Sequence, residues 1–196
     1  NGRITYLDAT TNPYTYITIS TAGYHVNAVG YNIENGLLYA HELGNVYPGN
    51  NLIRIDATGA IAALPVTVPF SSAKGDCDIS GNYYFINNMG NQVAVYDIST
   101  GTINTYGISG PRYRAWDMSF RAANGRFYGV NGKTLYVYNP SGHSCATSAV
   151  TGRLADDVDG GINSNTYGAS WTANDGYLYV GNNRSGRLYK INVNTG

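Results

Sequence analysis

A short phrase that recurs five times along the chain places the strongest constraint on its fold. In each copy apolar and polar residues alternate for a few positions, an Asp or Asn follows, and Thr, Ser or Gly closes the phrase, as at 52–59 and 187–196. The recurring Asp or Asn lies at positions 8, 56, 97, 139 and 192, so successive copies are 48, 41, 42 and 53 residues apart. A unit of four short antiparallel strands has this period. The sequence therefore predicts a repeat protein with four strands per unit.

Turn signals and a second recurring residue locate the unit boundaries. Asn-Gly or Asp-Gly, the pair most typical of a two-residue hairpin turn, stands at 35–36, 124–125 and 175–176. An aromatic residue follows at Tyr39, Phe85, Tyr128 and Tyr179, which we interpret as equivalent positions of the second strand. These marks predict one domain over 1–196, with a partial unit at 1–23 and units at about 24–73, 74–111, 112–160 and 161–196.

Individual strands can be expected within these units. The partial unit at 1–23 should hold only the third and fourth strands of a unit. We also expect a fourth strand at 61–68, first strands at 115–120 and 166–171, and a weak fourth strand at 146–150.

The fold class follows from the way these units must bury their apolar residues. No stretch has the 3.6-residue period of a helix, so we expect an all-β chain. Each antiparallel sheet carries apolar residues on both faces and needs a neighbour on each side, which radial packing supplies. We predict a β-propeller of about five four-stranded blades, in which one blade is incomplete or is closed by the N-terminal strands. We favour closure by pairing of early and late strands; strands donated between subunits would instead build a filament.

Composition excludes several classes of partner. The chain has 12 Lys and Arg against 12 Asp and Glu, so it has no net charge to attract nucleic acid. No apolar run approaches the ~18 residues that span a bilayer, and we expect no membrane insertion. The start at Asn1 predicts a mature or excised piece, and a surface rich in Gly, Asn and Tyr but poor in Lys and Glu predicts an extracellular or cell-surface location.

Two cysteines leave a disulfide open. Cys77 falls on a predicted first strand and Cys145 near the last strand of the following unit. An oxidising compartment would permit a bridge, but these places are expected to lie farther apart than the ~7 Å between Cα atoms that a disulfide allows. Two separate buried thiols are the alternative.

One family resemblance can be given on these motifs. The Asn-Gly or Asp-Gly turn, the Leu-Tyr strand and the Ile-Asp or Ile-Asn phrase ending in Thr-Gly occur together at 35–40 with 52–59 and at 175–180 with 187–196. They resemble the repeats of secreted β-propeller domains of uncharacterised function, the DUF6923-like class, found in large extracellular and adhesin-like proteins. The resemblance covers nearly the whole chain and implies an extracellular propeller. It carries no catalytic residues across.

Two tryptophans are the candidate ligand-binding residues. Trp116 and Trp171 are expected at neighbouring first-strand positions of successive units. An aromatic face can stack on the C–H groups of a sugar while nearby amides bind its hydroxyls, so these residues suggest carbohydrate binding. Packing in the core explains them equally well.

Acidic residues suggest two candidate metal sites. Asp156, Asp157 and Asp159 precede two glycines, a composition suited to supplying oxygen ligands to Ca²⁺, although a solvated loop between blades is the plainer interpretation. A second group, on the predicted first strands, could line the central channel and bind a cation, or could instead form hydrogen bonds at strand ends; it comprises Asp76, Asp78 and Asp117.

The remaining motifs favour no enzyme. The adjacent His41 and Glu42 should point to opposite faces of a strand, and no nucleophile or phosphate motif is present. Asn183 begins the one Asn-x-Ser/Thr sequence with a permitted middle residue and is a candidate glycosylation site. We expect a non-enzymatic, cofactor-free structural or adhesive module that associates with itself or with an extracellular protein or glycan. A carbohydrate-binding lectin and a metal-dependent hydrolase or lactonase are the alternatives.

Overall fold

The fold is that of a computed structural model, which describes residues 4–8, 10–13, 15–20, 25–42, 51–151, 167–183 and 185–196. Apart from the single-turn 3-10 helix η1 (Pro140–Gly142), every regular element in this part of the chain is a strand. None of these residues belongs to a helix long and apolar enough to cross a membrane. The all-β prediction is confirmed.

The strands form five antiparallel sheets, each built from strands consecutive in the sequence. A two-stranded sheet comes first, three four-stranded sheets follow and a three-stranded sheet ends the series; we call the last four blades one to four. The first sheet contains β1 (Ile4–Asp8) and β2 (Thr15–Ser20), and blade one contains β3 (Val26–Asn32), β4 (Leu37–Glu42), β5 (Asn51–Ile55) and β6 (Ile61–Ala63). Blade two contains β7 (Lys74–Cys77), β8 (Asn82–Ile86), β9 (Gln92–Asp97) and β10 (Thr102–Gly107), and blade three contains β11 (Ser119–Arg121), β12 (Arg126–Asn131), β13 (Thr134–Asn139) and β14 (Ser144–Ala149). Blade four contains β15 (Tyr167–Thr172), β16 (Tyr177–Asn182) and β17 (Leu188–Asn192).

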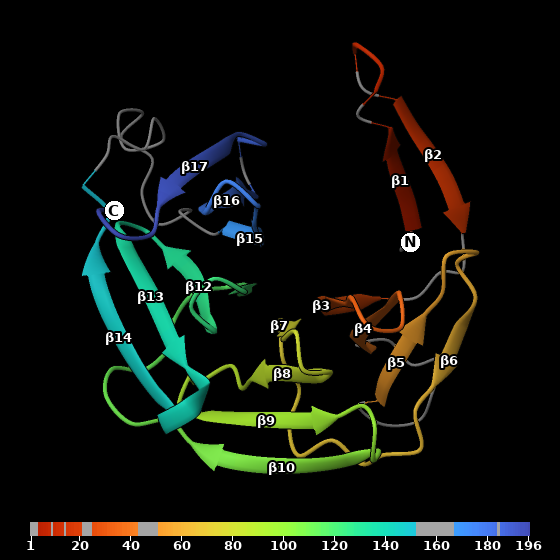
Figure 1. Ribbon diagram of the computed structural model, residues 1–196, viewed down its shortest axis with the longest axis horizontal. Coiled ribbons are helices and arrows are strands. Elements are labelled where there is room, and N and C mark those ends of the chain that lie inside the picture. The colour runs from red at the N-terminus through yellow and green to blue at the C-terminus, as the bar shows by residue number, and fades with distance from the viewer. Residues whose placement is uncertain are drawn as a thin grey trace.

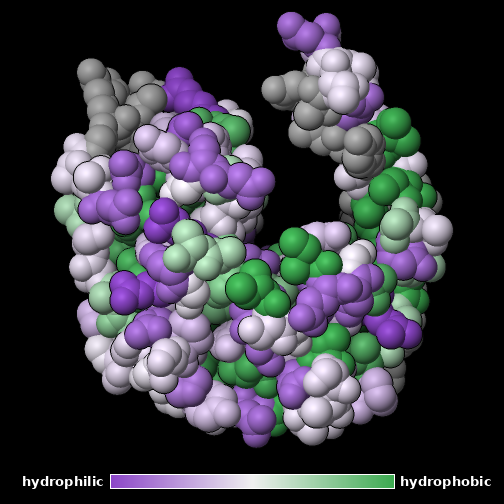
Figure 2. All heavy atoms as spheres, in the orientation of Figure 1, coloured by the Kyte–Doolittle hydropathy of each residue, from purple (hydrophilic) through white to green (hydrophobic). Residues whose placement is uncertain are grey.

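The blades are arranged radially around a central axis, with their first strands innermost (Figure 1). This is the predicted β-propeller. The ring is open: the β1–β2 hairpin stands at one end, blade four stands at the other, and Figure 2 shows a wide space between them. The first and last sheets share no ladder in the described residues. The sequence predicted that one blade is either incomplete or closed by the N-terminal strands. In the described residues that blade is incomplete.

The recurring Asp or Asn owes its position to one hairpin turn. It ends the third strand of each unit, and a side-chain oxygen accepts the backbone N–H of the residue two positions later, as Asp56 does from Thr58 at 2.8 Å. The same bond occurs in the β1–β2 hairpin, which confirms that the first sheet is a third-and-fourth-strand pair. All five copies make this bond; the acceptors are Asp8, Asp56, Asp97, Asn139 and Asn192.

The hydrophobic core is divided among the interfaces between neighbouring blades. A tyrosine at one register position of the second strand marks each interface, and it is buried where the next blade covers it, at Tyr39, Tyr84 and Tyr128. Tyr179 occupies the same register in blade four but is only partly buried. No described blade follows blade four, so one face of its sheet remains uncovered.

The register corrects one equivalence inferred from the sequence. Tyr39 pairs with Arg54, which lies two residues before Asp56. In blade two the residue two positions before Asp97 is Val95, and its partner is Tyr84. Phe85 therefore belongs to the opposite face of β8. Gly81 of the blade-two turn precedes Tyr84 by three residues, as Gly36 precedes Tyr39, so the turn glycine marks the correct equivalence.

Three expected strands have different limits. The strand expected at 61–68 ends at Ala63, because Pro65 has no N–H to donate to a ladder, although the chain beyond still packs alternate side chains into the core. The strand expected at 115–120 shortens to Ser119–Arg121. The fourth strand expected to be weak, near 146–150, is a full six-residue strand, Ser144–Ala149, paired along its length with β13.

Both cysteines are buried as free thiols. Cys77 lies on β7, the first strand of blade two, and Cys145 lies on β14, the last strand of blade three. The two residues belong to different hydrophobic clusters, one on each side of blade two. Of the two possibilities raised by the sequence, separate buried thiols describe the fold.

Candidate functional site

A surface hollow lies where the central channel opens beside the first hairpin of each blade. We call it the channel mouth; its volume is about 630 Å³, and it is lined by residues of all four blades. The innermost strands run in the same direction, so their C-terminal ends and the turns that follow meet at this one end of the channel. A site of this kind cannot be read from any single repeat.

Large apolar side chains crowd the rim of the channel mouth. Ile33 is 67% exposed and Ile79 is 54% exposed, although both residue types are usually buried. Tyr31 and Trp171 line the same hollow and are also exposed. Hydrophobic residues gather near the centre of the face seen in Figure 2, over β3 and β7. Burial in the fold does not explain these side chains.

Two aspartates beneath the mouth join neighbouring blades. Asp76 of blade two accepts the backbone N–H of Phe120 in blade three at 2.8 Å. Asp117, just before β11 of blade three, accepts the backbone N–H of Ser170 in blade four at 2.6 Å and the Ser170 hydroxyl at 3.1 Å. These carboxylates act as connectors around the channel. Their oxygens are directed at N–H donors, which supports the hydrogen-bonding interpretation over cation binding.

Burial governs the protonation of both connectors. Desolvation raises the pKa of Asp76 to about 7, although hydrogen bonds from the Phe120 and Cys77 backbone act to lower it. Desolvation likewise raises the pKa of Asp117 to about 7, and the nearby Asp76 adds to the rise. The two carboxyls therefore titrate near neutral pH.

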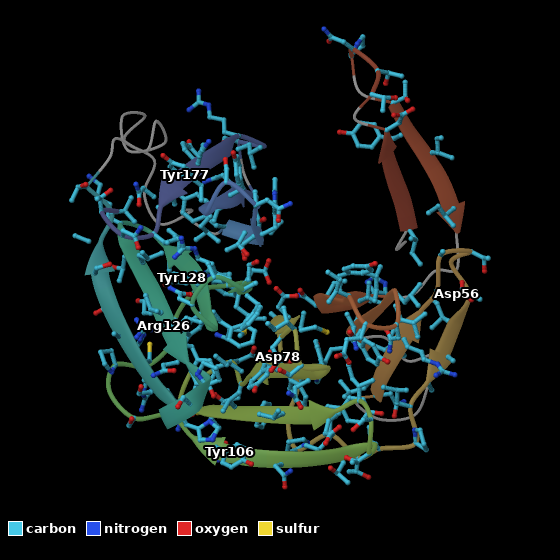
Figure 3. All side chains as sticks on the ribbon, viewed as in Figure 1. Asp56, Asp78, Tyr106, Arg126, Tyr128 and Tyr177 are labelled. Atoms are coloured by element: carbon cyan, nitrogen blue, oxygen red, sulfur yellow. The ribbon has the colours of Figure 1, made fainter. Side chains whose placement is uncertain are left out.

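Asp78 has a different role from the two connectors. Its carboxylate accepts the backbone N–H groups of Ser80 and Asn82, at 2.8 and 2.9 Å, and so holds the β7–β8 turn. The Asn82 side-chain amide donates a third bond to it at 3.0 Å. Asp78 lines the channel mouth, but its lone pairs serve the hairpin (Figure 3). It fits the expected hydrogen bonding at a strand end.

The charges around the mouth differ from blade to blade. Acidic Glu34 and Asp78 belong to the β3–β4 and β7–β8 turns. Basic Arg121 and Arg126 face each other across the β11–β12 turn, where they form a cross-strand pair. The turns of blades one and two are therefore acidic and that of blade three is basic, while in the turn of blade four Asp175 is paired with Lys190 at 2.8 Å.

The two tryptophans do not occupy equivalent positions, contrary to the expectation from the sequence. Trp171 lies on β15 opposite Tyr179, and its counterpart in blade three is Ser119, which pairs with Tyr128. Trp116 precedes β11 and belongs to no strand.

Neither tryptophan is a core residue. Trp171 is 44% exposed and Trp116 is 50% exposed. The Trp171 ring stacks on the Tyr179 ring, with centroids 5.3 Å apart and planes 10° apart, and it borders the channel mouth. Trp116 borders a second hollow at the other end of the channel. Both side chains remain available as ligand-binding candidates, at two separate places.

The other candidate residues lie elsewhere or outside the described part of the chain. Asp156, Asp157 and Asp159 are outside the described residues, and the residues that are described contain no group of three His, Cys, Asp or Glu side chains that could hold a metal. Asn183 is exposed in the β16–β17 turn, where its side-chain oxygen accepts the Gly168 N–H at 3.0 Å.

The adjacent pair His41 and Glu42 is buried in blade one. Among the residues that the structure describes, the side-chain nitrogens of His41 and the carboxylate oxygens of Glu42 find no hydrogen-bond partner. The His41 ring packs edge-on against Phe85, and burial lowers the pKa of His41 to about 4, so the ring is neutral at pH 7. This is an apolar environment for an imidazole.

The fold and the arrangement of these faces define a β-propeller. Comparison with known proteins adds a family: a model described as a repeat of unknown function, DUF6923, matches residues 3–196. The chain therefore belongs to the DUF6923 family, as the resemblance of its repeats implied. No curated protein matches the chain significantly.

Solved structures resemble the chain in fold. A putative gluconolactonase matches with 16% identity and a TM-score of 0.58 over 95% of this chain and 66% of its own length. Glutaminyl cyclase from Myxococcus xanthus matches with 10% identity and a TM-score of 0.61 over 90% and 75%. YCF48 bound to D1 peptide matches with 13% identity and a TM-score of 0.48 over 90% and 54%. The chain thus spans between about half and three quarters of these chains.

Proposed function

We propose that this propeller is a non-enzymatic extracellular structural or adhesive module that associates with a second copy of itself through the channel mouth. The observation that carries the proposal is the group of exposed apolar side chains on that rim, Tyr31, Ile33, Ile79 and Trp171. A contiguous apolar patch rimmed by polar residues is typical of a protein interaction surface. Its residues come from three blades, so a folded ring is needed to present it.

Charge supports a second copy as the partner. In a symmetric pair whose two-fold axis passes between them, the acidic turn with Glu34 would face the basic turn with Arg126 of the other copy. The chain carries 12 basic and 12 acidic residues, so two copies do not repel each other through net charge. Apolar contact would then supply affinity and the charges would set orientation.

Sedimentation velocity over a wide concentration range tests this proposal. The wild-type chain is expected to dimerise reversibly. The double substitution Ile33→Ser with Ile79→Ser should weaken the dimer by at least about two orders of magnitude, since each buried isoleucine contributes roughly 1.5–3 kcal/mol. Met89→Ser is the matched control, because Met89 is 59% exposed at the other end of the channel.

A charge-exchange experiment tests the orientation. Glu34→Arg and Arg126→Glu should each weaken self-association, and an equimolar mixture of the two variants should recover a mixed dimer. A wild-type chain that stays monomeric throughout, or an effect of Met89→Ser as large as that of the double substitution, would contradict the proposal.

Carbohydrate binding is the second candidate function. It is favoured by the exposure of Trp116 and Trp171, each at the border of a surface hollow. We propose no catalytic role, because Asp76 and Asp117 direct their oxygens at interblade N–H donors. The proposed module needs no metal, and it would act outside the cell or on its surface, in keeping with its Asn- and Tyr-rich composition.

A further inference from the structure

A second hollow opens at the end of the channel opposite the mouth, between blades two and three. Its volume is about 460 Å³, within the range of small-molecule sites. Lys74 at the start of β7 lines it, whereas Asp76, two residues later on the same strand, lines the channel mouth. The two hollows are therefore separate. We call the second one the basic hollow, after the charges described below.

An extended segment supplies one wall of the basic hollow. Along 112–116 burial alternates: Tyr113 and Ala115 are fully buried between the blades, while Arg112, Arg114 and Trp116 are exposed and line the hollow. In an extended chain side chains two apart point the same way and stand ~7 Å from each other. The segment thus presents two guanidinium groups and an indole ring side by side.

This wall is held in place by the fold. The Tyr113 N–H donates to the Gly90 carbonyl at 2.9 Å, and the Asn131 amide donates to the Arg114 carbonyl at 2.9 Å. Lys74 is buried, with only 5% of the residue exposed, and its ammonium group donates to the Tyr113 and Ala115 carbonyls at 3.4 and 3.2 Å. The segment is tied to both blades before any ligand arrives, which lowers the entropic cost of binding.

The charge of the hollow has one sign. Lys74, Arg112 and Arg114 line it, and no Asp or Glu does. Within the described ranges, no carboxylate forms an ion pair with either arginine. The chain as a whole has 12 basic and 12 acidic residues, so three cations grouped without an acidic residue stand out. Guanidinium groups bind carboxylates and sulfates through paired N–H donors.

We propose that the basic hollow binds an anionic saccharide, a sugar that carries carboxylate or sulfate groups. Trp116 would stack on the sugar ring, Arg112 and Arg114 would bind its acidic group, and the Asn88 and Asn131 amides at the border would bind hydroxyls. This inference rests on the carbohydrate-binding role named above as the second candidate. It is independent of self-association, which uses the opposite end of the channel.

Isothermal titration calorimetry with three tetrasaccharides tests the proposal on the intact chain. The probes are an oligogalacturonate, a sulfated heparin fragment and a neutral galactose oligomer of matched length. The two acidic probes should bind and the neutral one should bind at least about tenfold more weakly, the value of one charge-assisted hydrogen bond. Affinity for the acidic probes should fall as salt is raised.

Variants with matched controls locate the site. Arg112→Gln and Arg114→Gln should each weaken binding by about tenfold, whereas Arg126→Gln, the same change on an exposed arginine at the other end of the channel, should not. Trp116→Ala should abolish measurable binding. Thermal melting of every variant shows whether the fold is kept, and Trp116→Phe, which retains a flat ring, should restore part of the affinity.

Four results would overturn the proposal. They are equal affinity for neutral and acidic probes, equal loss with Arg126→Gln and Arg112→Gln, tighter binding of ATP than of either acidic saccharide, and no binding of any probe by the folded wild-type chain. The self-association double variant of Ile33 and Ile79 should bind the saccharides normally. Failure of one proposal would therefore leave the other intact.

Discussion

Replacing one buried hydroxyl would measure how strongly neighbouring blades are joined. The Tyr83 hydroxyl of blade two donates to the Ala28 carbonyl of blade one at 2.5 Å, and both residues are buried. Tyr83→Phe removes a single oxygen and leaves that carbonyl without its donor. An unsatisfied buried acceptor costs about 1–3 kcal/mol, so the free energy of unfolding should fall by that amount. For a domain of this size the melting temperature should drop by roughly 2–4 °C per kcal/mol.

Tyr96→Phe is the matched control for this measurement. Tyr96 lies directly across the β8–β9 ladder from Tyr83, but its hydroxyl ends beside the Gly101 turn and makes no interblade bond. Urea denaturation of both variants at pH 7 should show a loss for Tyr83→Phe that exceeds the loss for Tyr96→Phe by at least about 1 kcal/mol. Equal losses would refute the view that the hydroxyl joins the blades.

Three further predictions concern backbone, charge and thiols. Gly90→Ala should destabilise the fold by more than about 3 kcal/mol, and Gly125→Ala by only about 1 kcal/mol. Both glycines have positive φ, but a Cβ on Gly90 would lie 2.2 Å from the Tyr113 carbonyl oxygen, whereas nothing lies within 4 Å of a Cβ on Gly125. Similar urea unfolding curves for the two variants would contradict this prediction. The pKa of Asp76 and of Asp117 rises to about 7 on folding, from about 4 in an unfolded chain. Between about pH 4 and pH 7 the folded state therefore binds more protons than the unfolded state, and the stability that these two carboxyls contribute is lost as pH rises through 7. Asp117→Asn should then lose less stability than the wild type between pH 5 and 8 in urea titrations, and an equal or greater loss would count against the raised pKa. Both cysteine thiols are buried, so Ellman's reagent should label neither in the native protein and both in urea; rapid labelling of the native chain would be inconsistent with the core described.

Features that repeat along the chain could be predicted from the sequence. The Asp or Asn at positions 8, 56, 97, 139 and 192 makes the same turn bond in every unit, so its period gave the number and order of the hairpins. Such a signal is local: the acceptor and donor lie two residues apart. The unit boundaries and the propeller class followed from it.

Features that depend on contacts between units could not be predicted in the same way. Phe85 was matched to Tyr39 because blade two has three consecutive aromatic residues, and the strand pairing identified the middle one, Tyr84, as the equivalent. Trp116 and Trp171 looked equivalent in the sequence but lie at opposite ends of the channel. The basic hollow shows one missed signal: the alternation of Arg112, Arg114 and Trp116 is visible in the sequence, but its meaning depends on a neighbouring blade.

The division of the core among blade interfaces has a consequence for how such chains change over time. Each hydrophobic cluster between blades joins one face of a unit to the opposite face of the next, with a tyrosine at the same register position. Duplication or loss of a whole unit would remake an interface of the same kind at the point of the change. Lineages can therefore alter the diameter of the ring by gaining or losing units, while the turn chemistry within each unit is inherited unchanged.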